Sequence, residues 1–182
     1  GIFLGIITSL VFYLLRTSRP AVRDLVPDPQ ADPASKRKFV LRHPDLPDCP
    51  QLACLRVEGS IFFGAVDHVQ KHFTAVDAAD ARKKWLLLLA RGVNFIDLAG
   101  AELLDREARR RRALGGGLAI CGVKEGVCKP LHRGGHIPAI GDENLYDSKS
   151  EAIAAIFSRL DPAVCATCTA RIFRECGPRP AA

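Results

Sequence analysis

The stretch KKWLLLLA, residues 83–90, contains a continuous apolar run of strand length. A strand that is apolar on both faces needs cover on both, which predicts a central strand in a sheet packed between helices. The neighbouring segments 65–81 and 97–114 both have the character of helices, the first through apolar residues at helical spacing. Strand and helix signals that alternate in this way predict a compact α/β domain with a largely buried sheet.

The other segments fit the same alternation. The glycine-led run GGGLAICGV, residues 115–123, predicts a second buried strand. Residues 148–160 predict a helix with Ser148 or Ser150 as its N-cap. Weaker signals predict a short strand at 38–43 and two extended runs, separated by Glu58-Gly59, within 51–65. They also predict a short helix or turn at 124–135 and a loop with one short strand at 137–147.

Composition limits the class of protein. The 182 residues suffice for one domain, and 48% hydrophobic with 25% charged residues is ordinary for a chain with a buried core. The net charge of +6 suits contact with an anionic surface but is too small to indicate nucleic-acid binding. Seven scattered cysteines, an odd number, favour reduced thiols in the cytosol over a secreted disulfide framework.

Residues 1–15, GIFLGIITSLVFYLL, are uncharged and mostly apolar. A secretory signal requires a basic region before its apolar core, and none precedes this one. Fifteen helical residues span roughly 22 Å, less than the ~30 Å hydrocarbon core, so we expect the end of a membrane helix whose first turns lie upstream. From Arg16 to Arg42, seven basic against three acidic residues are typical of a cytoplasmic flank. A buried core helix is the alternative.

Proline and aspartate are frequent in residues 17–37, which predicts a linker. Near the other end, Asp161 as N-cap and Pro162 as first helical residue predict the start of a further helix. We therefore expect four parts. They are the end of a transmembrane helix (1–16), a cytoplasmic linker (17–37), a folded domain (38–160), and a cysteine-containing helix and tail (161–182).

Three stretches together resemble the C-terminal part of the SulP anion transporters. FLGIITSLVFYLLRTSRP is similar to the end of their last membrane helix, and LRVEGSIFFGAVDHVQKHF and LLLLARGVNFIDLAGAELL are similar to their cytoplasmic STAS domain. The resemblance implies a STAS-like mixed sheet of about four to five strands with packed helices, preceded by the end of a transmembrane helix. It also implies a homodimeric transporter of sulfate or a related inorganic anion in the inner or plasma membrane, with its transport site upstream of this sequence.

Asp97, Leu98, Ala99 and Gly100 lie at a predicted strand-to-helix junction and form the STAS motif, a possible regulatory site. Asp97 can cap the helix, and Gly100 permits close approach of backbones. In the anti-sigma factor antagonists that this motif resembles, a phosphorylated serine switches partner binding. Here Ala99 takes that position and Leu89 takes that of a second acid, so capping is predicted, with a regulatory contact as the alternative.

No catalytic, cofactor or metal site is predicted. His68 and His72 have the i,i+4 spacing of a metal pair, but the sequence places no third ligand. The arginine-rich segment REARRRRAL predicts a solvated helix face, with contact to anionic lipid as the alternative. Its acid-before-base pairs at i,i+4 spacing are Glu102–Arg106, Asp105–Arg109 and Glu107–Arg111.

Cys165, Cys168 and Cys176 share one face of the predicted C-terminal helix and form a candidate thiol site. A Cys-x-x-Cys pair is common in zinc and redox sites. On a straight helix, however, Cys165 and Cys176 would be ~16 Å apart, too far to share an ion. Packing of this face onto the domain is the alternative, because cysteine also behaves as a small core residue.

Two functions fit these features. The first is the cytoplasmic STAS portion of a SulP-type transporter, with the membrane domain of the same transporter as a partner and the bilayer contacted through residues 1–16. The second is a free-standing STAS regulator of the anti-sigma factor antagonist type. An enzyme is not expected, because the spacing of residues places no nucleophile beside a base.

Overall fold

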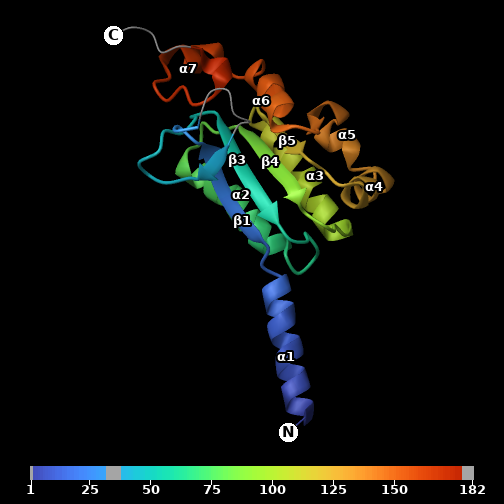
Figure 1. Ribbon diagram of the computed structural model, residues 1–182. Helices are drawn as coiled ribbons and strands as arrows, with labels where there is room; N and C mark the ends of the chain where they lie inside the picture. The colour runs from blue at the N-terminus through green and yellow to red at the C-terminus, as the bar shows by residue number, and fades with distance from the viewer. Residues whose placement is uncertain (1, 32–37, 178–182) are drawn as a thin grey trace.

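The computed structural model describes residues 2–31 and 38–177. Within them, a six-stranded mixed sheet in the order β2-β1-β3-β4-β5-β6 forms the centre of the molecule (Figure 1). Strands β3 to β6 run parallel, whereas β1 is antiparallel to both β2 and β3. The strands are β1 (Ala21–Pro27), β2 (Phe39–Leu41), β3 (Leu52–Glu58), β4 (Trp85–Gly92), β5 (Gly117–Cys121) and β6 (Leu145–Tyr146).

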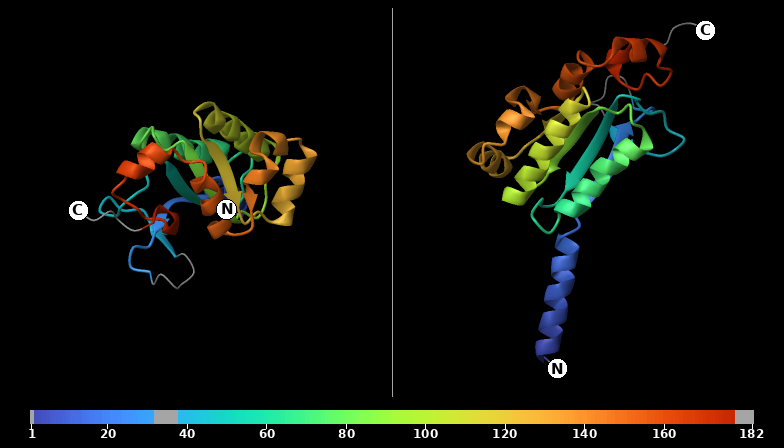
Figure 2. Two further views of the ribbon diagram at one scale, coloured as in Figure 1. Left: turned by 90° about the horizontal axis from the view of Figure 1, so that it is seen from above. Right: turned by 180° about the vertical axis from the view of Figure 1, so that it is seen from behind.

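Helices cover both faces of the sheet (Figure 2). Helices α2 and α3, together with α4 and α5, pack on one face, while α6 and the segment that follows it cover the other. The helices are α1 (Ile2–Thr17), α2 (Val66–Ala79), α3 (Leu98–Ala113), α4 (Glu125–Arg133), α5 (Ile137–Ile140), α6 (Lys149–Phe157) and α7 (Pro162–Thr167), with 3-10 turns η1 (Asp142–Asn144) and η2 (Arg174–Cys176).

Strand β4 shows why the sequence specifies this layering. Its side chains alternate between two apolar clusters, because successive residues of a strand point to opposite faces. Leu86 and Leu88 join the cluster under α2 and α3, whereas Leu87 and Leu89 join the cluster under α6. The predicted α/β fold with a doubly covered central strand is therefore confirmed, and the sheet has six strands rather than four to five.

The linker prediction is wrong for residues 21–27, which form β1 inside the sheet. Leu25 and Val26 are buried in it. Pro27 is tolerated because the ladder to β3 ends at Leu25, so the proline interrupts no bond on that side. Residues 32–37 of the predicted linker and 178–182 of the predicted tail lie outside the described residues.

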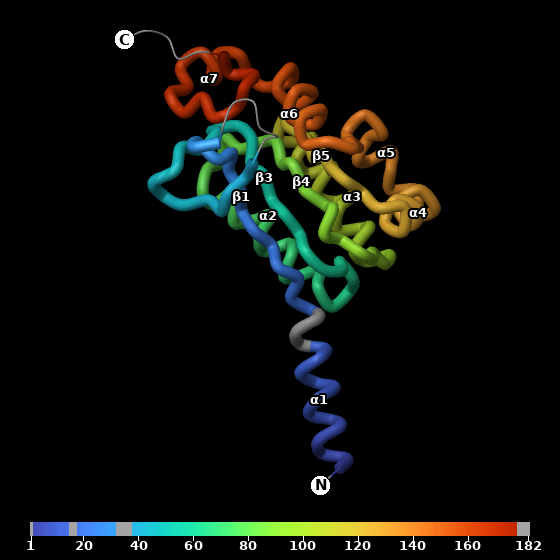
Figure 3. The backbone as a smooth tube through the Cα atoms, in the orientation of Figure 1, coloured from blue at the N-terminus to red at the C-terminus, as the bar shows by residue number. Residues whose placement is uncertain are grey.

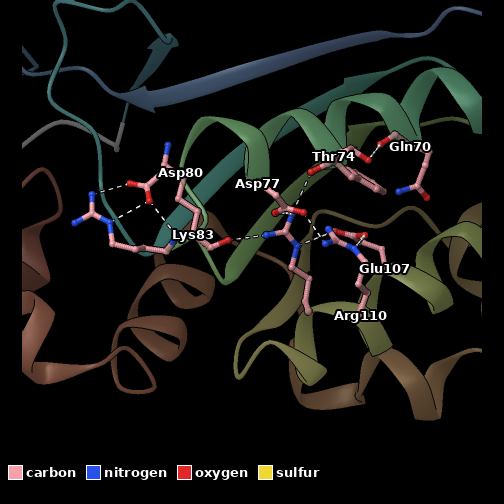
Figure 4. Close-up of polar contacts among 10 residues, drawn as sticks. Gln70, Thr74, Asp77, Asp80, Lys83, Glu107 and Arg110 are labelled. Carbon is pink, nitrogen blue, oxygen red and sulfur yellow. Dashed lines mark hydrogen bonds and ion pairs between the residues drawn. The ribbon is translucent and has the colours of Figure 1, made fainter.

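The arginine-rich helix α3 is only partly the solvated face that its sequence predicts. The pair Glu102–Arg106 is present on its exposed side, and in the pair Asp105–Arg109 the arginine is exposed while the aspartate is largely covered. Glu107 and Arg111 are instead buried, with 1% and 0% of their surfaces exposed. Figure 4 shows the polar network around them, in which Asp77 of α2 faces Glu107 and Arg110 of α3.

Two further predictions differ from the structure. Residues 137–147, predicted as a loop with one short strand, form α5 and η1 before β6. In the segment 51–65, the first extended run is β3, but beyond Gly59 only an isolated bridge between Ile61 and Ile96 is formed.

Helix α1 projects from one end of the domain, and the tube in Figure 3 follows the chain from α1 into β1. The carboxyl ends of β3 and β4 point toward that end, whereas α7 lies at the opposite end (Figure 1). The helix predicted for residues 1–15 is thus present. In the described residues, no helix combines the length and apolar character needed to cross a membrane.

Candidate functional site

The STAS motif lies at the junction between β4 and α3, on the end of the domain from which α1 projects. Asp97 is the N-cap of α3, and its Oδ1 accepts a hydrogen bond from the Gly100 N–H at 2.9 Å. Its other carboxylate oxygen, Oδ2, accepts from the Phe63 N–H at 2.9 Å. The predicted cap is therefore confirmed, and the same side chain also ties α3 to the loop that leads into α2.

Gly100 is required by close packing. A Cβ atom at this position would lie 2.2 Å from the carbonyl oxygen of Ile61, a backbone atom that cannot move aside alone. The glycine thus lets the first turn of α3 lie directly against the loop after β3. Ala99 is half-buried beside it, and having no hydroxyl it offers no acceptor for phosphate.

Three large apolar side chains are exposed around this junction. They are Phe63, Phe95 and Leu98, with 77%, 52% and 65% of their surfaces accessible. They come from the loops that precede α2 and α3 and from the first residue of α3. Exposed apolar residues gathered around one helix start form a surface suited to a partner protein. The sequence alone does not reveal this surface, because it does not show which loops lie close together.

Replacing Asp97 with alanine is expected to lower the free energy of unfolding by about 1–2 kcal/mol, because the Gly100 and Phe63 N–H groups both lose their acceptor. Urea unfolding followed by the fluorescence of Trp85, the single tryptophan, measures this loss. Asp97→Asn separates the two contacts, because asparagine keeps one acceptor oxygen for the helix cap but presents a donor to the other N–H, so we expect a smaller loss than for alanine. An unchanged midpoint for Asp97→Ala would show that the cap is dispensable.

A cavity of about 360 Å³ lies where α1 meets the domain, lined by Ser18, Arg19, Gly64, Asp67, His68 and Lys71. His68 donates through Nε2 to the Pro20 carbonyl oxygen at 3.0 Å, and His72 Nδ1 lies 2.9 Å from the His68 carbonyl oxygen. Both rings are thus engaged with backbone.

The tail cysteines are arranged differently from the prediction. Helix α7 ends at Thr167, so Cys165 lies on it, Cys168 is its C-cap, and Cys176 belongs to the 3-10 turn η2. The assumption of one straight helix is therefore wrong. The three cysteines line a single cavity together with Cys49, a residue that sequence reasoning did not connect with them.

Burial controls the chemistry of these thiols. It raises the pKa of Cys49 to about 11, and it also raises the pKa of Cys165 and of Cys176. Because the thiolate is the reactive form of cysteine, groups with raised pKa values are poor nucleophiles near neutral pH. The arrangement therefore favours a structural role for the cluster over a catalytic redox role.

The fold and the α3 junction define a STAS domain, and the family model described as "STAS domain" matches residues 43–152. The chain belongs to this family. It is 23% identical over 151 residues to the Bacillus subtilis (strain 168) protein described as "Putative sulfate transporter YvdB", covering 83% of this chain and 26% of that protein.

Solved structures agree on the fold. The murine solute carrier 26 family member A9 anion transporter, in its inward-facing state, matches with a TM-score of 0.71 at 16% identity, over 87% of this chain and 25% of that one. An anti-sigma factor antagonist from Mycobacterium paratuberculosis matches with a TM-score of 0.51 at 17% identity, over 75% of this chain and 95% of that one. The chain spans about a quarter of the length of the transporters that it matches.

Proposed function

We propose that this chain is the STAS-containing part of a SulP-type secondary transporter of sulfate or a related inorganic anion, and that it serves assembly or regulation. In this proposal α1 is the end of the last membrane helix and contacts the membrane domain and the bilayer through residues 1–16. The STAS domain lies in the cytoplasm beneath the inner or plasma membrane. The transporter is a homodimer, and the chain binds no nucleic acid and catalyses no reaction.

One observation carries the proposal, which is the exposure of α1. Ten of its large side chains have between 48% and 83% of their surfaces accessible, and they lie on all sides of the helix. Full burial of such a side chain is worth about 1.5–3 kcal/mol, so an apolar helix of this kind needs lipid or protein around it. A regulator that works alone in water gains nothing from such a helix.

The relation to transporters supports the same reading. The match to the murine anion transporter extends over 87% of this chain, more than the residues matched by the STAS family model. Phe63, Phe95 and Leu98 are exposed and come from the loops before α2 and α3 and from the start of α3, and these helix starts lie at the end of the domain from which α1 projects. They are therefore suited to contact the membrane domain.

The test is membrane extraction of the full chain and of residues 18–182, both produced in a bacterial host. We expect the full chain to stay with the membrane after carbonate washing and to require detergent, whereas residues 18–182 appear in the supernatant as a folded domain. Leu10→Lys is expected to shift the full chain toward the supernatant, because a lysine within an apolar helix opposes insertion by about 3 kcal/mol.

Leu41→Lys is the matched control, since Leu41 on β2 and Leu10 on α1 are exposed to similar extents, 57% and 55%. This variant should stay with the membrane. If the full chain instead stays in the supernatant without aggregating, the apolar side chains of α1 are covered by protein rather than by lipid. The free-standing STAS regulator then becomes the better assignment.

A further inference from the structure

Four of the seven cysteines line one small cavity at the end of the domain opposite α1. The cavity has a volume of about 30 Å³. Cys49 reaches it from the loop before β3, and Cys165, Cys168 and Cys176 reach it from the C-terminal segment. Cys54, Cys121 and Cys128 do not line it.

The course of the backbone brings these thiols together. After α7 ends, the chain passes through Arg171, whose φ of 39° lies in the left-handed region that non-glycine residues seldom adopt. Phe173 then packs against the sheet, and η2 places Cys176 at the same cavity as Cys165. The objection that Cys165 and Cys176 are too far apart therefore does not apply to this structure.

A hydrogen-bond donor faces one of the four sulfur atoms. Gln51, a buried side chain, donates through Nε2 to Cys165 Sγ at 3.2 Å. Neutral thiols are weak acceptors, whereas sulfurs that bind a metal are commonly stabilised by such donors.

Positive charge is also close. Arg171 lines the cavity and donates to the Cys176 carbonyl oxygen at 2.5 Å. A guanidinium group beside the four cysteines would offset part of the negative charge that the cysteines acquire as thiolates.

The C-terminal segment has little apolar core of its own. Among the described residues 161–177, Phe173 alone is buried. Short irregular segments with so few buried residues usually depend on a metal ion or on disulfides, and disulfides are rare in reducing compartments.

We propose that Cys49, Cys165, Cys168 and Cys176 bind one zinc ion that fixes the C-terminal segment to the sheet. Each thiol releases its proton as it binds, and four sulfurs complete a tetrahedral structural site. In the described part of the chain, no three His, Cys, Asp or Glu side chains already stand at metal-binding geometry. Binding therefore requires the segment 165–176 to move inward until all four sulfur atoms reach one ion, starting from thiols that line the same cavity.

The test is the metal content of the full chain, purified in detergent under anaerobic, reducing conditions. We expect about one zinc ion per chain by mass spectrometry of the metal, and we expect Cys165→Ser and Cys49→Ser to lower this at least about tenfold. After removal of the zinc, added Co²⁺ should give the visible absorption of tetrahedral cobalt and a sulfur-to-cobalt charge-transfer band.

Cys128→Ser is the matched control, because Cys128 is a partly buried cysteine on α4 that does not line the cavity, and it should keep its zinc. The cobalt spectrum of the unmutated chain keeps the test valid if a variant fails to fold. A chain without metal whose intact mass reveals disulfides overturns the proposal, as does one with four free thiols and no cobalt band. Neither result bears on membrane extraction, so the proposed function is tested separately.

Discussion

Arg111→Met is expected to lower the free energy of unfolding by about 3–5 kcal/mol, since it removes one member of a buried, charged network. Such a loss is a large part of the ~5–15 kcal/mol that stabilises a typical domain. Urea unfolding monitored by Trp85 fluorescence measures it well, because Trp85 lies in β4 at the centre of the sheet and α1 contains no tryptophan.

The size of this effect follows from the contacts of the guanidinium group. Arg111 Nε donates to Glu107 Oε1 at 2.7 Å, and Nη1 donates to the Lys83 carbonyl oxygen at 2.6 Å. Nη2 pairs with Asp77 Oδ1 at 2.9 Å and donates to the Phe73 carbonyl oxygen at 3.3 Å. One side chain thus joins α3, α2 and the turn before β4, and methionine leaves the buried acceptors without their donor.

Arg110→Met is the matched control. Arg110 contacts the same two carboxylates, Glu107 and Asp77, from the next position in α3, but its side chain is 37% exposed. Water can solvate the two carboxylates where Arg110 is removed, so we expect the free energy of unfolding to fall by about 1 kcal/mol or less. Equal losses for Arg110→Met and Arg111→Met would contradict the importance of the buried contacts.

A chain that starts at Lys36 is expected to lose cooperative unfolding altogether, whereas one that starts at Ser18 keeps it. The shorter chain lacks β1, which lies between β2 and β3 and pairs with both. It also lacks Leu25 and Val26, two buried side chains worth about 1.5–3 kcal/mol each. Without β1, strand β2 has no neighbour and β3 becomes an exposed edge prone to aggregation.

Gel filtration and urea titration of both truncated chains test this expectation. The chain from Ser18 serves as the control, because it also lacks α1 and differs only in retaining residues 18–35. Equal urea midpoints for the two chains would show that β1 contributes nothing to the domain.

The sequence predicts best those elements whose pattern depends on their own neighbours. The apolar run around Leu87 predicts a strand covered on both faces, and the structure places its residues in both cores. Asp97 is correctly predicted as an N-cap, and of the two candidates Ser148 and Ser150 the structure uses Ser148, because capping involves only the next few residues of the chain. The family resemblance is confirmed through the STAS domain on the same local motifs.

Features that depend on distant residues were missed. Strand β1 lacks a clear period and ends in proline, and only its pairing with β2 and β3 reveals it. Spacing at i,i+4 is the same for an exposed pair and for Glu107 with Arg111, so burial beneath α2 is invisible in the sequence. The approach of Cys49 to the tail depends on where α7 ends, which sequence patterns place poorly.

Only residues 18–20 separate the end of α1 from the start of β1. Ser18 donates to the Leu14 carbonyl oxygen through both its N–H and its hydroxyl, and the Pro20 carbonyl oxygen is held by His68. A connection this short, with hydrogen bonds to the helix on one side and to α2 on the other, limits how far α1 and β1 can move independently. We therefore expect a tilt or rotation of α1 to be transmitted to β1 and through it to the sheet, and a force on the sheet to reach the helix by the same route.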